Sequence, residues 1–170
     1  MQRFRVLHPM VLLMLACVSV ASGRAAHAEP TSHRLTLYSQ IMESHMNDMA
    51  SDGRSMGDTF TTNNQLHSAP GGALIAMAET SLVVTKSAVN NNGRERRLFR
   101  MIMTWPNGKD SIVIEGISIA AVPDDWMRTA VPSYRAITGG TGRFNGARGQ
   151  AVFTRKDATW VKIGLRFEVL

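Results

Sequence analysis

The sequence predicts an all-β domain, an antiparallel barrel or sandwich of about seven or eight short strands. Residues 159–169 alternate between an apolar and a mostly polar set with a period of two, which indicates a strand with one buried face. Residues 111–122 (SIVIEGISIAAV) are β-branched and apolar on both faces, as in a strand that is covered on both sides. No segment offers three clean helical turns. A length of 170 residues corresponds to one domain, with or without a targeting segment.

Residues 1–28 have the features of a cleavable secretory signal. Arg3 and Arg5 precede an apolar run over residues 10–20, and small residues follow up to Ala28. The run is too short to cross a membrane, which needs about 20 apolar residues. A lipoprotein signal with Cys17 as the attachment point is the alternative. We expect an exported, periplasmic or secreted domain over residues 29–170 with no membrane span.

Removal of this signal changes the charge and the cysteine content. Its three arginines take the net charge from +6 to +3, so the high isoelectric point does not indicate a nucleic-acid partner. Cys17 is the one cysteine, and it leaves with the signal. The exported domain therefore has no disulfide and no thiolate nucleophile or metal ligand.

The remaining elements follow in chain order. Residues 34–42 and 73–89 are strand candidates, and the second ends at a turn in residues 90–93 (NNNG). Residues 44–56 lack a sustained helical stripe and are predicted as a long loop. Residues 97–105 and 111–122 form a predicted hairpin around residues 106–108 (PNG). Residues 124–127 have room for one helical turn, and residues 150–155 are a short strand candidate.

Residues 137–149 (ITGGTGRFNGARG) are unusually rich in glycine. The spacing does not match a phosphate-binding P-loop, which requires a lysine after its second glycine. It also does not match a dinucleotide-binding turn, because no helical pattern follows. Glycines that permit a positive φ or a close backbone approach, where one strand bends into the next, explain the run better.

The same region resembles the signature of the dirigent and allene oxide cyclase superfamily. Residues 133–144 (SYRAITGGTGRF) and 147–149 (ARG) carry the likeness. The motif residues are Gly139, Gly140, Thr141, Gly142, Phe144, Ala147, Arg148 and Gly149. Residues 57–60 (GDTF), 64–66 (NQL) and 99–116 are similar to further parts of the family, so the resemblance covers nearly the whole exported domain.

This resemblance implies an eight-stranded antiparallel barrel with an elongated, lipocalin-like apolar cavity, usually as a homotrimer. It implies neither a metal nor an organic cofactor. The implied role is to bind a small, largely apolar molecule and to steer its cyclisation, isomerisation or coupling. The family's acid and arginine positions fall on other residue types here, with Gln40 and Tyr38 in the first strand and Ser133 just before Arg135.

Each candidate site residue has two interpretations. Glu115, the candidate catalytic residue, is either an acid inside a pocket with a raised pKa or an outward side chain paired with an arginine. The same two choices apply to Glu79. Arg135 either binds an anionic head group or forms an ion pair on the outer face. Tyr38 and Gln40 are candidate ligand contacts, and Arg148 is expected to be structural.

Two other function classes stay open, and one basic cluster needs an interpretation. The first class is a non-catalytic exported barrel that binds a ligand or serves a structural role. The second is a copper-binding protein, for which the candidate ligands are His33, His45, His67, Met42, Met46, Met49 and Met56.

The cluster of Arg94, Arg96, Arg97 and Arg100 is predicted to be a solvated hairpin end rather than a polyanion site.

Overall fold

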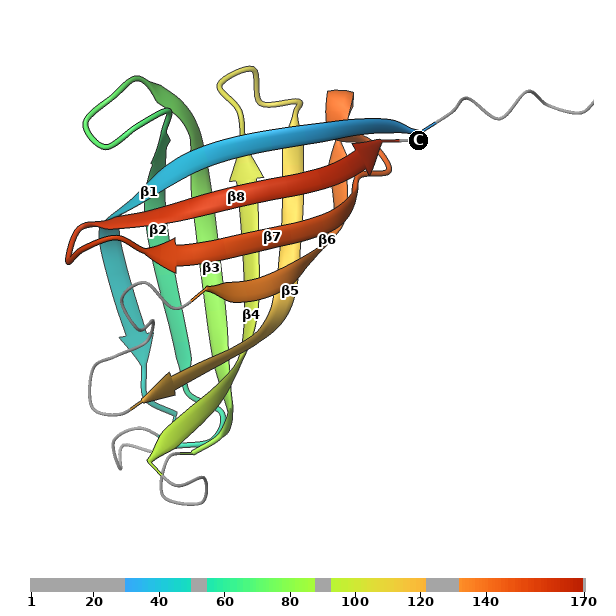
Figure 1. Ribbon diagram of the computed structural model, residues 1–170. Helices are drawn as coiled ribbons and strands as arrows, with labels where there is room; N and C mark the ends of the chain where they lie inside the picture. The colour runs from blue at the N-terminus through green and yellow to red at the C-terminus, as the bar shows by residue number, and fades with distance from the viewer. Residues whose placement is uncertain (1–29, 50–54, 88–92, 122–131, 170) are drawn as a thin grey trace, which may run out of the picture.

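The computed structural model describes residues 30–49, 55–87, 93–121 and 132–169, which form a closed barrel of eight antiparallel strands (Figure 1). The eight-stranded barrel predicted from the resemblance is confirmed. The strands are β1 (Thr31–Asn47), β2 (Thr59–His67), β3 (Leu74–Lys86), β4 (Arg94–Thr104), β5 (Ser111–Ala121), β6 (Ser133–Thr141), β7 (Arg148–Arg155) and β8 (Trp160–Val169). A short 3₁₀ helix, η1 (Gly142–Phe144), joins β6 to β7.

Each strand pairs with its neighbours in the chain, and β1 pairs with β8 to close the barrel. That last ladder runs from Thr31 opposite Val169 to Gln40 opposite Trp160, and the two strands lie side by side in Figure 1. Closure leaves no unpaired sheet edge along these strands, so every strand has an inner and an outer face.

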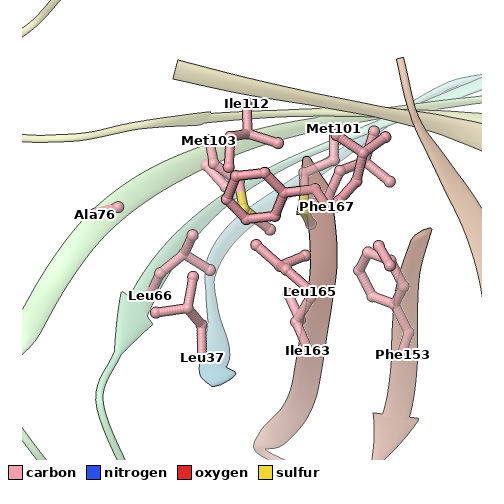
Figure 2. Close-up of a cluster of buried hydrophobic side chains, with 14 of the residues drawn as sticks. Leu37, Leu66, Ala76, Met101, Met103, Ile112, Phe153, Ile163, Leu165 and Phe167 are labelled. Carbon is pink, nitrogen blue, oxygen red and sulfur yellow. The ribbon is translucent and has the colours of Figure 1, made fainter. Parts of the chain in front are cut away.

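The inner faces carry the hydrophobic core. Along β8, Val161, Ile163, Leu165 and Phe167 are buried, which confirms the alternation predicted for the C-terminal strand. Figure 2 shows Ile163, Leu165 and Phe167 among side chains from β1, β2, β4, β5 and β7 inside the barrel. Toward one end, Phe144 lies with its ring centroid 4.6 Å from that of Trp105 and 5.7 Å from that of Phe167. These three aromatic side chains pack together and line a second pocket of about 310 Å³ at that end.

The prediction of a loop over residues 44–56 is wrong for its first part. The strand β1 continues to Asn47, paired residue by residue with the start of β2 after a bulge between Ile41 and Glu43. Long-range pairing supplies the backbone hydrogen bonds that local periodicity does not reveal. Asp58 then fixes the connection, because its carboxylate accepts hydrogen bonds from the backbone N–H groups of Met49 and Ser55.

The glycine motif serves the connection between β6 and β7, as expected of a structural role. Gly142 has φ +60°, and a Cβ there would lie 2.1 Å from Oδ1 of Asp110. A Cβ on Gly140 would meet two carbonyl oxygens at 2.5 Å, and one on Gly149 would meet the backbone of β8. These positions therefore exclude any larger residue.

Asp110 is the polar centre of this connection. Its carboxylate accepts hydrogen bonds from the backbone N–H of Arg143 (3.0 Å) and from the side-chain amide of Asn107 (2.8 Å). It also pairs with Nε of Arg143 at 3.0 Å. The hydrogen bond from the Arg143 backbone, followed by that from Asn107, holds the pKa of Asp110 below its usual value of 3.8.

Two predictions fall on residues outside the described ranges. They are the signal over residues 1–28 and the helical turn over residues 124–127, and both stay predictions. Within the four described segments, no helix has the length and apolar character to cross a membrane.

Gly142→Ala is expected to lower the free energy of unfolding by about 2–4 kcal/mol, because the left-handed backbone strain adds to the collision with Asp110. Gly108→Ala is the matched control, since Gly108 has φ +65° with nothing within 4 Å of an added Cβ. It should cost only the backbone strain, about 1–2 kcal/mol. Urea unfolding of both variants measures the difference, and equal losses would contradict the assigned role of Asp110.

The lowered pKa of Asp110 makes its contribution to stability dependent on pH. The folded state favours the ionised carboxylate, so this contribution is present above the usual value of 3.8 and is lost as the pH falls through the lower folded value. Asp110→Asn is therefore expected to destabilise the protein at pH 7 and to reduce the stability difference between pH 7 and pH 3. Denaturant titrations at both pH values test this, and an unchanged pH dependence would count against it.

Candidate functional site

A cavity of about 350 Å³ lies inside the barrel, away from the aromatic cluster of Trp105, Phe144 and Phe167. Residues of six strands line it: Ser39, Ile41, Ser44, His45, Met46, Phe60, Thr61, Thr62, Asn64, Thr80, Leu82, Arg97, Phe99, Met101, Phe153, Val161 and Ile163. Its lining residues at the end of β1 (Ser44, His45 and Met46) are exposed to solvent. The cavity is therefore accessible from that end of the barrel.

The cavity has an apolar side and a polar side. Phe99 and Met101 from β4, Phe153 from β7, and Val161 and Ile163 from β8 are buried and apolar. A molecule in contact with these side chains would be shielded from water on that side.

The polar side comes from β1, β2 and β3, where Ser39, Thr62, Asn64 and Thr80 face inward. The amide nitrogen of Asn64 donates to the hydroxyl oxygens of Thr62 (2.9 Å) and Thr80 (3.1 Å). These hydrogen bonds hold the amide of Asn64 in one orientation across the two strands. The cavity thus offers fixed polar groups opposite an apolar surface.

An ion pair between Glu95 and Arg97 lies on the inner face of β4, with side-chain exposures of 0% and 4%. Both Nε and Nη2 of Arg97 donate to Oε2 of Glu95. The guanidinium carbon of Arg97 also lies 4.8 Å from the centroid of the Phe60 ring. Oε1 of Glu95 is buried and accepts no hydrogen bond.

Arg135 is the second buried cation of the interior. Its guanidinium carbon lies 4.1 Å from the ring centroid of Phe99 and 4.6 Å from that of Phe153, and Nη1 donates to Oγ of Ser133 at 2.9 Å. Nε has no hydrogen-bond partner among the described residues. Burial lowers the pKa of Arg135 to about 10, so the group remains charged at neutral pH.

Gly116 makes room for Arg135. A Cβ on Gly116 would lie 3.1 Å from Cγ of Arg135, on the strand between Phe99 and Arg135. Ser118, the next inward residue of β5, is buried directly opposite Arg97. Inward residues of β4, β5 and β6 thus form a polar belt, which we define as Glu95, Arg97, Ser118, Ser133 and Arg135. Two guanidinium groups and one carboxylate give these five residues a net positive charge of one.

The structure separates Arg135 from the other predicted site residues. Glu115 lies on the outer face with a side-chain exposure of 42%, where it pairs with Nε of Arg100 at 3.4 Å and accepts a hydrogen bond from Thr138. Glu79 is exposed on the outer face of β3. Tyr38 and Gln40 alternate with the inward Leu37 and Ser39 of β1, so they too are on the outer face. Of this group, only Arg135 is inside the barrel.

The prediction of a solvated basic cluster holds for Arg94, Arg96 and Arg100 and is wrong for Arg97. Arg97 has the opposite strand parity and faces the interior, with an exposure of 3%. The alternation along the strand separates Arg97 from Arg96 and Arg100 in the sequence. It does not say which of the two sets faces the interior, because that depends on the pairing of β4 with β3 and β5. Glu95 was missed for the same reason.

The structure does not bring together the three histidines of the predicted copper site, His33, His45 and His67. His33 stacks on Phe167 near the start of β1, His45 lies near the other end of the same strand, and His67 packs edge-on against Trp160. Among the described residues, no group of three or more His, Cys, Asp or Glu is placed to hold a metal ion.

No family model and no curated protein matches this sequence. Solved structures do match. A pterocarpan synthase dirigent protein, GePTS1, superposes with a TM-score of 0.64 at 17% identity, covering 84% of this chain and 87% of that one. The chain has the dirigent barrel fold. Pyocyanin demethylase (TM-score 0.59, 17% identity, 79% and 99% of the chains) and a heme-binding cyclase that catalyses a [4 + 2] cycloaddition (0.60, 13%, 82% and 65%) share it.

Arg135→Met is expected to leave the barrel folded and to weaken the binding of naphthoate, an anionic aromatic probe, by about thirtyfold. A unit charge about 8 Å away contributes about 2 kcal/mol at an effective dielectric constant of about 20. Binding of the uncharged ethylnaphthalene should not change. Fluorescence titration of both probes measures this. An equal loss for both would show that Arg135 acts by packing and not by charge.

Proposed function

We propose that this barrel binds a small, largely apolar molecule in its cavity and steers the cyclisation, isomerisation or coupling of that molecule. The observation that carries the proposal is the cavity itself: about 350 Å³ with an apolar side, fixed polar groups opposite and a buried cationic belt. A barrel that served only as structure would have no use for charged groups whose burial costs stability.

The chemistry that such a cavity performs is conformational control. A flexible, reactive molecule held against Phe99 and Phe153 loses most of its alternative conformers, so one ring closure or one face of attack is favoured. Exclusion of water from the apolar side protects a reactive intermediate from hydrolysis. The positive belt favours an electron-rich or anionic group at one end of the ligand.

The proposal places the protein outside the cytoplasm, with residues 1–28 as the export signal, and takes a homotrimer as its working state. Support for an oligomer comes from the outer face of β4 and β5, where Leu98, Ile117 and Ile119 are 49%, 42% and 58% exposed. Adjacent exposed apolar side chains of this size are typical of surfaces that are covered in an assembly.

Ser39→Phe tests the cavity. Ser39 is buried and lines the cavity, whereas its neighbour Gln40 faces outward, so Gln40→Phe adds the same ring outside the barrel. Ser39→Phe should place a phenyl ring inside the cavity and so obstruct a ligand there. Protein purified from its own host is expected to carry a small organic adduct in native mass spectrometry as wild type and as Gln40→Phe, and not as Ser39→Phe.

Turnover has its own readout in the same pair of variants. Cyclisation and isomerisation conserve mass, so wild type and Gln40→Phe should convert a component of the host's extract into an isomer with a different retention time. An adduct that is released unchanged would make the protein a carrier and would contradict the steering role. Equal adducts in all three proteins would place the ligand outside the cavity and contradict the proposal.

A further inference from the structure

We infer that Arg97, held by Glu95, is the group that binds a neutral carbonyl oxygen of the substrate and sets the specificity of the cavity. The inference rests on the proposed function, because it takes the cavity to be the ligand site. Among the described residues, Arg97 is the one guanidinium that lines the cavity, whereas Arg135 lies behind the rings of Phe99 and Phe153.

The hydrogen bonds of Arg97 leave one nitrogen for a ligand. Nε and Nη2 of Arg97 both donate to one carboxylate oxygen of Glu95. Nη1 has no hydrogen-bond acceptor among the described residues. The contact with Phe60 and the pair with Glu95 restrict the plane of the guanidinium at the cavity wall, so Nη1 keeps one orientation there. A donor that is already oriented loses little entropy when it binds an acceptor.

Charge balance decides which acceptor Arg97 prefers. The carboxylate of Glu95 compensates its positive charge, so a second, fully anionic group would meet repulsion from Glu95 as well as attraction from Arg97. A neutral carbonyl oxygen gains the hydrogen bond without that repulsion. Arg135 has no carboxylate partner among the described residues, so the full anion is expected to depend on Arg135 instead.

The position of Arg97 also defines the shape of the ligand. Phe99 follows two residues later on the same inner face of β4, and it forms part of the apolar side of the cavity. A molecule whose carbonyl oxygen reaches Nη1 therefore rests its adjacent apolar body on Phe99. Where the carbonyl is conjugated to the reacting bonds, its oxygen gains negative charge in the transition state, and Arg97 stabilises that charge without any proton transfer.

Three aromatic probes of nearly equal size separate these contributions. Acetylnaphthalene carries a neutral carbonyl, ethylnaphthalene replaces it with a methylene, and naphthoate carries a full charge. Wild-type protein is expected to bind acetylnaphthalene about tenfold more tightly than ethylnaphthalene, as one hydrogen bond to a charged donor provides. Fluorescence titration gives the three dissociation constants.

Glu95→Gln is the informative variant. It removes the compensating charge and keeps an oxygen that can accept from Arg97, so naphthoate should gain about tenfold in affinity while the preference for acetylnaphthalene over ethylnaphthalene falls. Glu115→Gln is the matched control. It also removes the carboxylate that pairs with an arginine of β4, but that arginine is Arg100 on the exposed outer face. It should leave all three dissociation constants unchanged.

The double variant Glu95→Gln with Arg97→Met guards against a folding defect. Removing Arg97 alone would leave Glu95 buried and unpaired, whereas the double variant removes both charges. It is expected to remain folded by circular dichroism, to bind ethylnaphthalene as the wild type does, and to lose the preference for acetylnaphthalene.

Three outcomes would overturn the inference. They are an intact preference for acetylnaphthalene in the double variant, no gain for naphthoate in Glu95→Gln, and the same gain in Glu115→Gln. Failure of the proposed function looks different. All three probes, ethylnaphthalene included, would then fail to bind wild type, or would bind wild type and Ser39→Phe equally well. That result would remove the ligand site and the inference together.

Discussion

Pairing of β1 with β8 is the interaction on which the rest of this structure depends. It closes the sheet, and closure gives each strand one face toward a shared interior and one toward the outside. The same ladder places Ser39 of β1 beside Val161 of β8, so it joins the polar and the apolar side of the cavity. Without closure, Glu95, Arg97 and Arg135 would lie on an open face and would have no reason to form a buried belt.

The two ends of the barrel interior differ in their side chains. At one end, Trp105, Phe144 and Phe167 pack against one another beside a second pocket, and the glycine motif with Asp110 fixes the connection between β6 and β7. The glycines allow the backbones to approach closely there. The other half keeps a cavity and the charged belt, which cost stability. This arrangement is typical of a rigid scaffold that supports a binding site.

Features set by local interactions could be predicted from the sequence, whereas features set by pairing between distant strands could not. The alternation in β8 and the PNG turn between β4 and β5 are local, and both were predicted. The glycine motif resembled a known family closely enough to predict the eight-stranded barrel. The inward direction of Arg97 and the outward direction of Glu115 depend on which face of β4 and β5 closes over the core. In both strands the inward and the outward set of residues include apolar and polar side chains. The sequence alone therefore could not show which of the two residues faces inward. Arg135 was singled out, but its aromatic partners Phe99 and Phe153 come from other strands.

A crystal structure of the protein with acetylnaphthalene bound tests the central claim most directly. The account predicts the naphthalene rings inside the barrel against Phe99 and Phe153, with the carbonyl oxygen within hydrogen-bonding distance of Nη1 of Arg97. Rings bound on the outer face over Leu98, Ile117 and Ile119, with an empty interior, would contradict it. So would rings inside the barrel with the carbonyl directed away from Arg97, because the belt would then have no part in recognising the ligand.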